Sequence, residues 1–222
     1  MGMESRNKIK SIMGILSDVD IDEPAIKNKN NKHIWIPVQD HSKVGTYFTY
    51  IYQNEWYEKY FKEETIQFAK EKAEKEIKAK SPFEFILSQL KYLEEEKERQ
   101  KEYINEKYHN NINDINYQYL LENIEELVNR DNGIAFMFEN RKKDELKKAY
   151  ELLKLYRPSL NILKEVFVSY VKNKYEEIKE KKEAKDGEDL NNFKSDLENL
   201  ISECFGNDTL FQEEKNKILL NS

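Results

Sequence analysis

The sequence contains few of the residues that interrupt helices. Its 222 residues include only six glycines and four prolines, whereas these two residue types make up about 12% of an average chain. So few turn-forming residues exclude a fold with many short hairpins and favour long helices. We therefore predict an all-α fold in the form of a long-helix bundle.

Cysteine and long apolar runs are also scarce. The single cysteine, Cys204, excludes an intramolecular disulfide framework. No stretch approaches the ~20 consecutive apolar residues of a membrane span, and none resembles the apolar core of a secretory signal. We predict an intracellular protein, in the cytoplasm or the nucleus, without a membrane partner.

No charge of one sign dominates the chain. The 37 basic and 43 acidic residues give a net charge of -6, and lysines alternate with glutamates, so no positive field attracts phosphates. We predict no nucleic-acid partner. A charged fraction of 36% and a mean hydropathy of -0.92 would also suit a disordered chain, but 14 tyrosines, 11 phenylalanines and two tryptophans provide the large apolar area of a folded core.

The pattern of apolar residues divides the chain into three segments. Residues 1–17 place Ile9, Ile12 and Leu16 at helical spacing, residues 18–45 form a loop or linker with an extended apolar patch around Trp35, and residues 46–222 form a helical bundle. The bundle helices are predicted at residues 46–79, 82–104, 120–128, 142–155, 159–181 and 190–205.

Three local motifs mark helix ends. Ser81-Pro82-Phe83-Glu84 has the pattern of a capping box with proline at the first helical position, so a helix starts there. Asp131-Asn132-Gly133 predicts a turn that ends the helix containing Leu127. Asp186-Gly187 is predicted to separate the last two helices.

Few residues of the sequence are candidates for catalysis or for binding a metal or a cofactor. Glu106 and His109 have the Glu-x-x-His spacing of a di-iron ligand pair in a helical bundle, but such a site needs a second copy, and His33 and His41 lie in the loop region without that spacing. Cys204 lies on an apolar helix face and is predicted to be part of the core. The six glycines form no phosphate-binding motif. We therefore nominate no catalytic, cofactor-binding or metal-ligating residue, and no cofactor.

Six short motifs follow one another in a recognisable order. They are Tyr60-Phe61-Lys62-Glu63-Glu64-Thr65-x-x-Phe68, the helix from Pro82 that continues into Glu94-Glu95-Glu96-Lys97-Glu98-Arg99, Leu127-Val128, Asp144-Glu145-Leu146-x-x-x-Tyr150-x-Leu152-Leu153, Ser159-Leu160-x-x-Leu163, and Phe205-Gly206-Asn207-Asp208-x-x-Phe211. This order resembles the third N-terminal repeat of the cullins, a five-helix bundle, over about residues 46–217. Gly206 stands where that family has asparagine, and the charged stretch of residues 70–80 is longer than in the family.

The resemblance implies a rigid stalk segment of a cullin-RING ubiquitin ligase scaffold. Such a scaffold contributes no catalytic groups and holds the substrate receptor apart from the RING protein and its ubiquitin-conjugating enzyme. Residues 1–17 would then be the end of the preceding repeat. The partners of the full-length protein would be a RING-box protein, a substrate adaptor and a ubiquitin-like modifier. None of them is expected to bind this segment directly, and the segment is expected to be a monomer.

The turn at residues 131–134 before Phe138 is similar to the branch of the family that recruits BTB-type adaptors. Two other classes of function stay open. A free-standing helical tether or trafficking adaptor, with no link to ubiquitin, would present an exposed apolar patch of its own. A carboxylate-bridged metal enzyme would contain bound iron or manganese.

Overall fold

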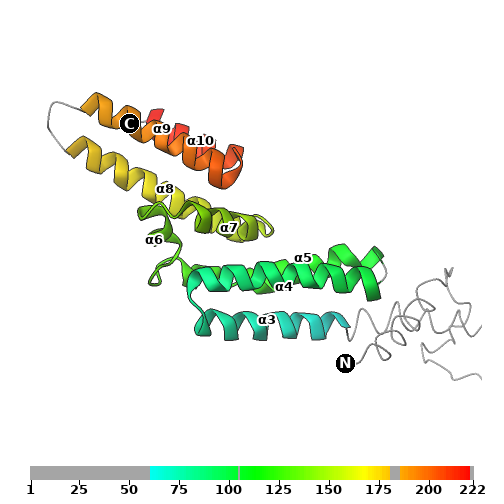
Figure 1. The fold of residues 1–222 in the computed structure, drawn as a ribbon. Helices are drawn as coiled ribbons and strands as arrows, with labels where there is room; N and C mark the ends of the chain where they lie inside the picture. The colour runs from blue at the N-terminus through cyan, green and yellow to red at the C-terminus, as the bar shows by residue number, and fades with distance from the viewer. Residues whose placement is uncertain (1–60, 105, 181–185, 221–222) are drawn as a thin grey trace, which may run out of the picture. The chain divides into compact units, whose positions relative to one another are not determined.

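The computed structural model describes residues 61–104, 106–180 and 186–220. Within these ranges it contains eight α-helices, two short 3-10 helices and no strand, so the predicted all-α class is confirmed (Figure 1). The predicted helix in residues 1–17 and the loop at 18–45 lie outside the described residues. The division at residues 17 and 45 therefore stays a prediction.

Two compact units divide the described residues. One contains residues 61–69 and 93–116, and the other contains residues 70–92 and everything described from 117 onward. The boundaries fall inside three helices: α3 (Lys62–Ala79), α4 (Pro82–Tyr103) and α5 (His109–Leu121). Each unit therefore holds a part of each of these helices.

The first unit is centred on the start of α5. Tyr108, at the end of the 3-10 helix η3 (Glu106–Tyr108), and Ile112 are buried, and Phe61 and Ile104 pack against them. Buried Gln100 of α4 donates from Nε2 to Oδ1 of Asn113, 3.2 Å away. One apolar cluster and one amide contact therefore join the end of α4 to the start of α5.

The capping box predicted at the start of α4 is confirmed in the second unit. The backbone N–H of Ser81 donates to Oε2 of Glu84 at 3.0 Å, and the N–H of Glu84 lies 3.4 Å from the Ser81 hydroxyl oxygen. Pro82 occupies the first helical position, where no amide proton is needed. The reciprocal contacts of the capping box satisfy two amides that the helix leaves unpaired.

The helix predicted at residues 120–128 is wrong in form. The α5 helix ends at Leu121, and a 3-10 helix, η4 (Ile124–Leu127), follows it. Leu120, Leu121, Ile124 and Leu127 are all buried, so the apolar positions point inward as expected. A tighter turn, and not a continuous α-helix, brings the last two to the core.

A short helix that the sequence did not predict follows the turn at residues 131–133. It is α6 (Ile134–Glu139), and buried Gly133 precedes it. A Cβ atom on Gly133 would lie 2.3 Å from the carbonyl oxygen of Leu127 and 2.7 Å from that of Arg130. Both neighbours are backbone atoms that cannot give way, so only glycine fits this turn.

Four longer helices complete the second unit: α7 (Lys143–Leu153), α8 (Arg157–Glu180), α9 (Asp186–Phe205) and α10 (Thr209–Leu220). The central helix is α8, which contacts α6, α7, α9 and α10 (Figure 1). Leu163 of α8 is fully buried. Because α9 already begins at Asp186, the predicted separator Asp186-Gly187 forms its first turn. The sequence reading also missed helix α10.

Candidate functional site

The predicted di-iron spacing has a structural role at the end of α4. Nε2 of His109 lies 3.1 Å from the carbonyl oxygen of Gln100 and 2.9 Å from that of Ile104. Because both partners are acceptors, Nε2 carries a proton and offers no lone pair to a metal. Glu106 is exposed. Across the described ranges, no three His, Cys, Asp or Glu side chains form a group that could hold a metal ion; His33 and His41 lie outside those ranges.

The single thiol is buried in α9, as predicted. Cys204 is 2% exposed, and its Sγ lies 3.4 Å from the carbonyl oxygen of Lys143. Burial, with a smaller contribution from the Glu203 carboxylate, raises the pKa of the Cys204 thiol to about 11. The thiol therefore stays protonated near neutral pH and is a poor nucleophile.

Two of the six sequence motifs meet in space at the turn between α9 and α10. The hydroxyl of Tyr150, in α7, donates to Oδ2 of Asp208 at 2.9 Å. The other oxygen of the same carboxylate, Oδ1, accepts the backbone N–H of Leu210 at 2.9 Å and caps α10. Burial, together with the bond to Asp208, raises the pKa of Tyr150 to about 12.

An aromatic cluster lies beside this contact, and we define it by its six rings. The rings of Phe205 and Phe211 are stacked with centroids 4.2 Å apart, and the Tyr150 ring lies 5.4 Å from Phe205. The cluster draws on all five helices from α6 to α10: Phe138, Tyr150, Phe167, Tyr170, Phe205 and Phe211. Ring contacts of this kind contribute about 0.5–1.5 kcal/mol each beyond the area they bury.

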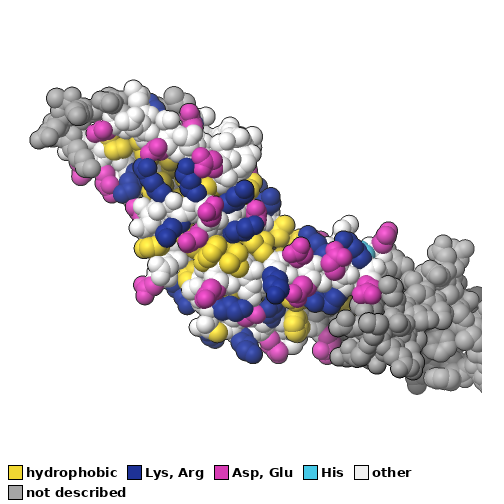
Figure 2. All heavy atoms as spheres, viewed as in Figure 1, with side chains coloured by type: hydrophobic (Ala, Val, Ile, Leu, Met, Phe, Trp, Pro, Cys, Tyr) yellow, Lys and Arg dark blue, Asp and Glu magenta, His cyan; other side chains and the backbone are white. Residues whose placement is uncertain are grey.

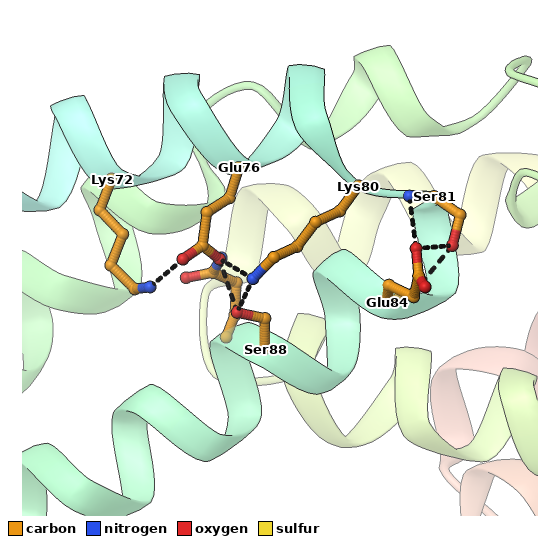
Figure 3. Close-up of polar contacts among 7 residues, drawn as sticks. Lys72, Glu76, Lys80, Ser81, Glu84 and Ser88 are labelled. Atoms are coloured by element: carbon orange, nitrogen blue, oxygen red, sulfur yellow. Dashed lines mark hydrogen bonds and ion pairs between the residues drawn. The ribbon is translucent and has the colours of Figure 1, made fainter.

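A polar cluster joins α3 to α4 in the same unit (Figure 3). Oε2 of Glu76 accepts from the Ser88 hydroxyl at 2.6 Å, from Nε2 of buried Gln89 at 2.9 Å and from Lys80 at 2.9 Å. Its other oxygen accepts from Lys72. Burial raises the pKa of the Glu76 carboxyl, but the hydrogen bonds from Lys72, Ser88 and Lys80 outweigh burial and hold it at about 2.

Arg130, which lies outside this polar cluster, contacts the end of α3. The guanidinium of Arg130 donates to the carbonyl oxygen of Ile77 and, at 3.3 Å, to that of Lys80. These carbonyls belong to the last turn of α3 and the residue just after it, where the helix itself offers no amide partner. Arg130 therefore links the turn before α6 to the end of α3.

The sequence model of the family described as "Cullin alpha solenoid domain" matches residues 3–219. The chain belongs to the cullin family. No curated protein matches the sequence. Cullins are non-catalytic scaffolds of ubiquitin ligase complexes and bind other proteins, among them adaptors and RING-box proteins.

The turn before α10 contains two residues with left-handed backbones. Gly206 has φ +57° and Asn207 has φ +60°. Glycine and asparagine are the residues that most readily adopt this left-handed conformation. Glycine at position 206 and asparagine at position 207 therefore suit this turn.

The surface of the second unit has two hollows without a concentration of reactive groups. A groove of about 440 Å³ has an apolar lining of Val168, Tyr175 and Ile218 between lysines and glutamates of α8 and α10. A smaller hollow of about 70 Å³ lies beside Arg141 and Asp196. On the face shown in Figure 2, basic and acidic side chains alternate. None of the helices in the described part is long and apolar enough to cross a membrane.

The sequence did not predict the contacts that Glu76 and Asp208 make between helices. Lys72, Glu76 and Lys80 have the i and i+4 spacing that is typical of surface ion pairs, but nothing local in the sequence places Ser88 and Gln89 beside the carboxylate. The bond of Asp208 to Tyr150 joins residues 58 positions apart. A partner at that distance in sequence is determined by how the helices pack, which the motifs do not encode.

Proposed function

We propose that this chain is a rigid stalk segment of a cullin scaffold. In this role it holds a substrate receptor at a fixed distance from the RING protein and its ubiquitin-conjugating enzyme. The observation that carries the proposal is the family match over residues 3–219. The meeting of two cullin-like motifs at Tyr150 and Asp208 supports it.

Stiffness is the property that such a function requires. A scaffold raises the effective concentration of substrate near the loaded enzyme only if the geometry is held. The 24 residues of α8 span roughly 36 Å at ~1.5 Å per residue. Contacts from four other helices keep α8 in place, and an aromatic cluster shared by all five resists bending.

The partners of the complete assembly would be a RING-box protein, a substrate adaptor and a ubiquitin-like modifier, bound outside this segment. The short turn at residues 131–133, directly before α6, favours an adaptor of the BTB type. The segment would itself be a monomer inside the cell, without catalytic groups or cofactor. Residues 1–17 would end a preceding repeat, residues 18–45 would link it to the bundle, and the repeat would begin near residue 46.

Affinity purification from the protein's own cells, followed by mass spectrometry, tests this proposal. A small RING protein, a ubiquitin-like modifier and a BTB-type adaptor should co-purify with the tagged protein. Coat or cytoskeletal proteins in their place would contradict the scaffold function and favour a trafficking adaptor. Recovery of the RING protein with adaptors of another type would reject only the BTB branch.

Direct binding by the purified 222-residue chain is the matched control. Titration of the chain with a RING-box protein or with a BTB adaptor should give no heat of binding, because we place both sites outside this segment. Measurable binding of either partner would show that the segment is more than a spacer.

A further inference from the structure

One side chain ties α7 and α10 together at a single point. Asp208 accepts the Tyr150 hydroxyl on one oxygen and the backbone N–H of Leu210, in the first turn of α10, on the other, each at 2.9 Å. We propose that Asp208 is a positioning residue, which sets the direction of α10 relative to α7 through its bond to Tyr150.

The turn between α9 and α10 makes no backbone hydrogen bond to α7 among the described residues. Only residues 206–208 separate the end of α9 from the start of α10. Two of them, Gly206 and Asn207, have left-handed backbones, and a Cβ on Gly206 would meet no atom within 4 Å. The N–H groups of Asn207 and Asp208 close the turn through the carbonyl oxygens of Ile201 and Phe205, at 3.1 and 3.0 Å. Neither bond reaches α7, so the direction of α10 relative to α7 depends on side-chain contacts.

The neighbouring rings restrain position more than direction. Phe205 and Phe211 stack at 4.2 Å, and the Tyr150 ring meets Phe211 edge-on at 6.1 Å. Apolar contacts tolerate sliding and small rotations, whereas a hydrogen bond weakens steeply when its angle departs from linearity. The Tyr150 hydroxyl stays protonated at neutral pH, so it donates to Asp208 throughout the physiological range.

The functional consequence rests on the proposed stalk. In a scaffold that holds its partners at a distance, a small rotation of one helix moves a distant partner by a larger amount. Loss of the bond should therefore reduce ubiquitin transfer without removing any binding partner.

Electron paramagnetic resonance distances between spin labels on α7 and α10 test the positioning role. Lys147 and Asn216 are both exposed, so Lys147→Cys and Asn216→Cys accept labels while the buried Cys204 thiol does not react. Tyr150→Phe removes the hydroxyl and keeps the ring. Asp208→Ser keeps a helix cap but is too short to reach Tyr150. Tyr156→Phe, at another half-buried tyrosine, is the control.

We expect one narrow distance in the unmodified chain and in Tyr156→Phe, and a distribution at least about twice as wide in Tyr150→Phe and Asp208→Ser. The core variant Ile86→Val, which lowers stability but leaves both bonds of Asp208 intact, should keep the narrow distance. Equal widths in all chains would overturn the positioning role. So would the same broadening in Ile86→Val, because it would attribute the effect to general loosening.

Ubiquitin transfer by the assembled ligase separates this inference from the proposed function. Tyr150→Phe should transfer ubiquitin several-fold more slowly than Tyr156→Phe, with unchanged co-purification of adaptor and RING protein. Broad distances with unchanged transfer would leave Asp208 as a positioning residue and overturn its importance for the stalk. If no ligase assembles around the chain, the stalk function fails and the distance measurement still decides the role of Asp208.

Discussion

Two regions of the same unit are held by different chemistry. One is the aromatic cluster of helices α6 to α10 with Asp208, which we call the aromatic corner, and the other is the contact between α3 and α4 around Glu76, which we call the polar pair. In the first, six rings pack together and one carboxylate, that of Asp208, joins two helices. In the second, one carboxylate, that of Glu76, gathers two lysines, a serine and a glutamine. The aromatic corner depends mainly on buried area and the polar pair on charge.

This difference predicts how each region responds to conditions. Burial of rings does not change with protonation, so the aromatic corner should hold across a wide range of pH. The Glu76 cluster depends on an ionised carboxylate and should fail in acid. The two regions can therefore be weakened separately, first by changes to the core and then by changes to charge.

The largest effect is expected from a charge in the centre of α8. Leu163 is fully buried, so Leu163→Asp removes an apolar side chain and places an unpaired carboxylate in its position. We expect a loss of about 5 kcal/mol in the free energy of unfolding, read from urea denaturation followed by circular dichroism. A melting temperature equal to that of the unmodified chain would show that Leu163 does not lie in the core.

Loss of one ring should come next. Phe205 is 1% exposed and meets the rings of Phe138, Tyr150, Phe167 and Phe211. Phe205→Ala should cost about 4 kcal/mol, because the cavity it leaves lies between helices that cannot close in. Phe136→Ala is the control, since that ring is 39% exposed and should cost less than about 1 kcal/mol. Equal costs for both variants would refute the central place of the cluster.

Charge removal at the polar pair should have an intermediate effect that depends on pH. Glu76→Gln weakens bonds from Lys72, Lys80 and Ser88 and should cost about 2 kcal/mol at pH 7. The folded pKa of about 2 lies below the ordinary value of 4.5. The stabilisation is therefore complete above pH 4.5 and is lost as the pH falls through 2.

Urea unfolding of the unmodified chain and of Glu76→Gln from pH 7 to pH 2 measures this. The difference between the two chains should shrink between pH 4.5 and pH 2. Glu74→Gln, on an exposed position of the same helix, should show no such dependence. A difference that stays constant down to pH 2 would mean that the carboxylate does not hold α3 to α4.

The smallest effect is expected at the surface ion pairs. Arg141 and Asp196 form a 2.8 Å pair, but their side chains are 64% and 47% exposed, so water screens them. Asp196→Asn should change the free energy of unfolding by less than about 0.5 kcal/mol. A cost near that of Glu76→Gln would mean that exposed pairs contribute to stiffness as much as the half-buried cluster does.

The sequence predicted the elements whose causes are local. The capping box at Ser81 and Glu84 involves residues three positions apart, and the apolar spacing of Leu160 and Leu163 repeats within one helix turn. Both were therefore predicted correctly. The boundary at Asp186 was not, because a single glycine near the start of a helix is tolerated and does not end the helix.

The features that the sequence did not predict are short elements and contacts between residues far apart in the chain. Six residues are too few for α6 to show a helical period, and the break between α5 and η4 arises from packing that draws Ile124 and Leu127 inward. The bonds from Tyr150 to Asp208 and from Glu76 to Gln89 link separate helices. Motif order indicated that the segments belong together, but only coordinates show which atoms meet.

The crowding around Gly133 limits which mutations its codon can tolerate. Because three backbone oxygens occupy the space beside its Cα, every missense change at this codon replaces the smallest residue with one that cannot fit. In a library of all single substitutions selected for folded protein, this codon should tolerate only synonymous changes, while the nearby exposed Asp131 accepts several residues. The tolerance of this one codon to substitution would then report whether folding of the protein requires the turn before α6.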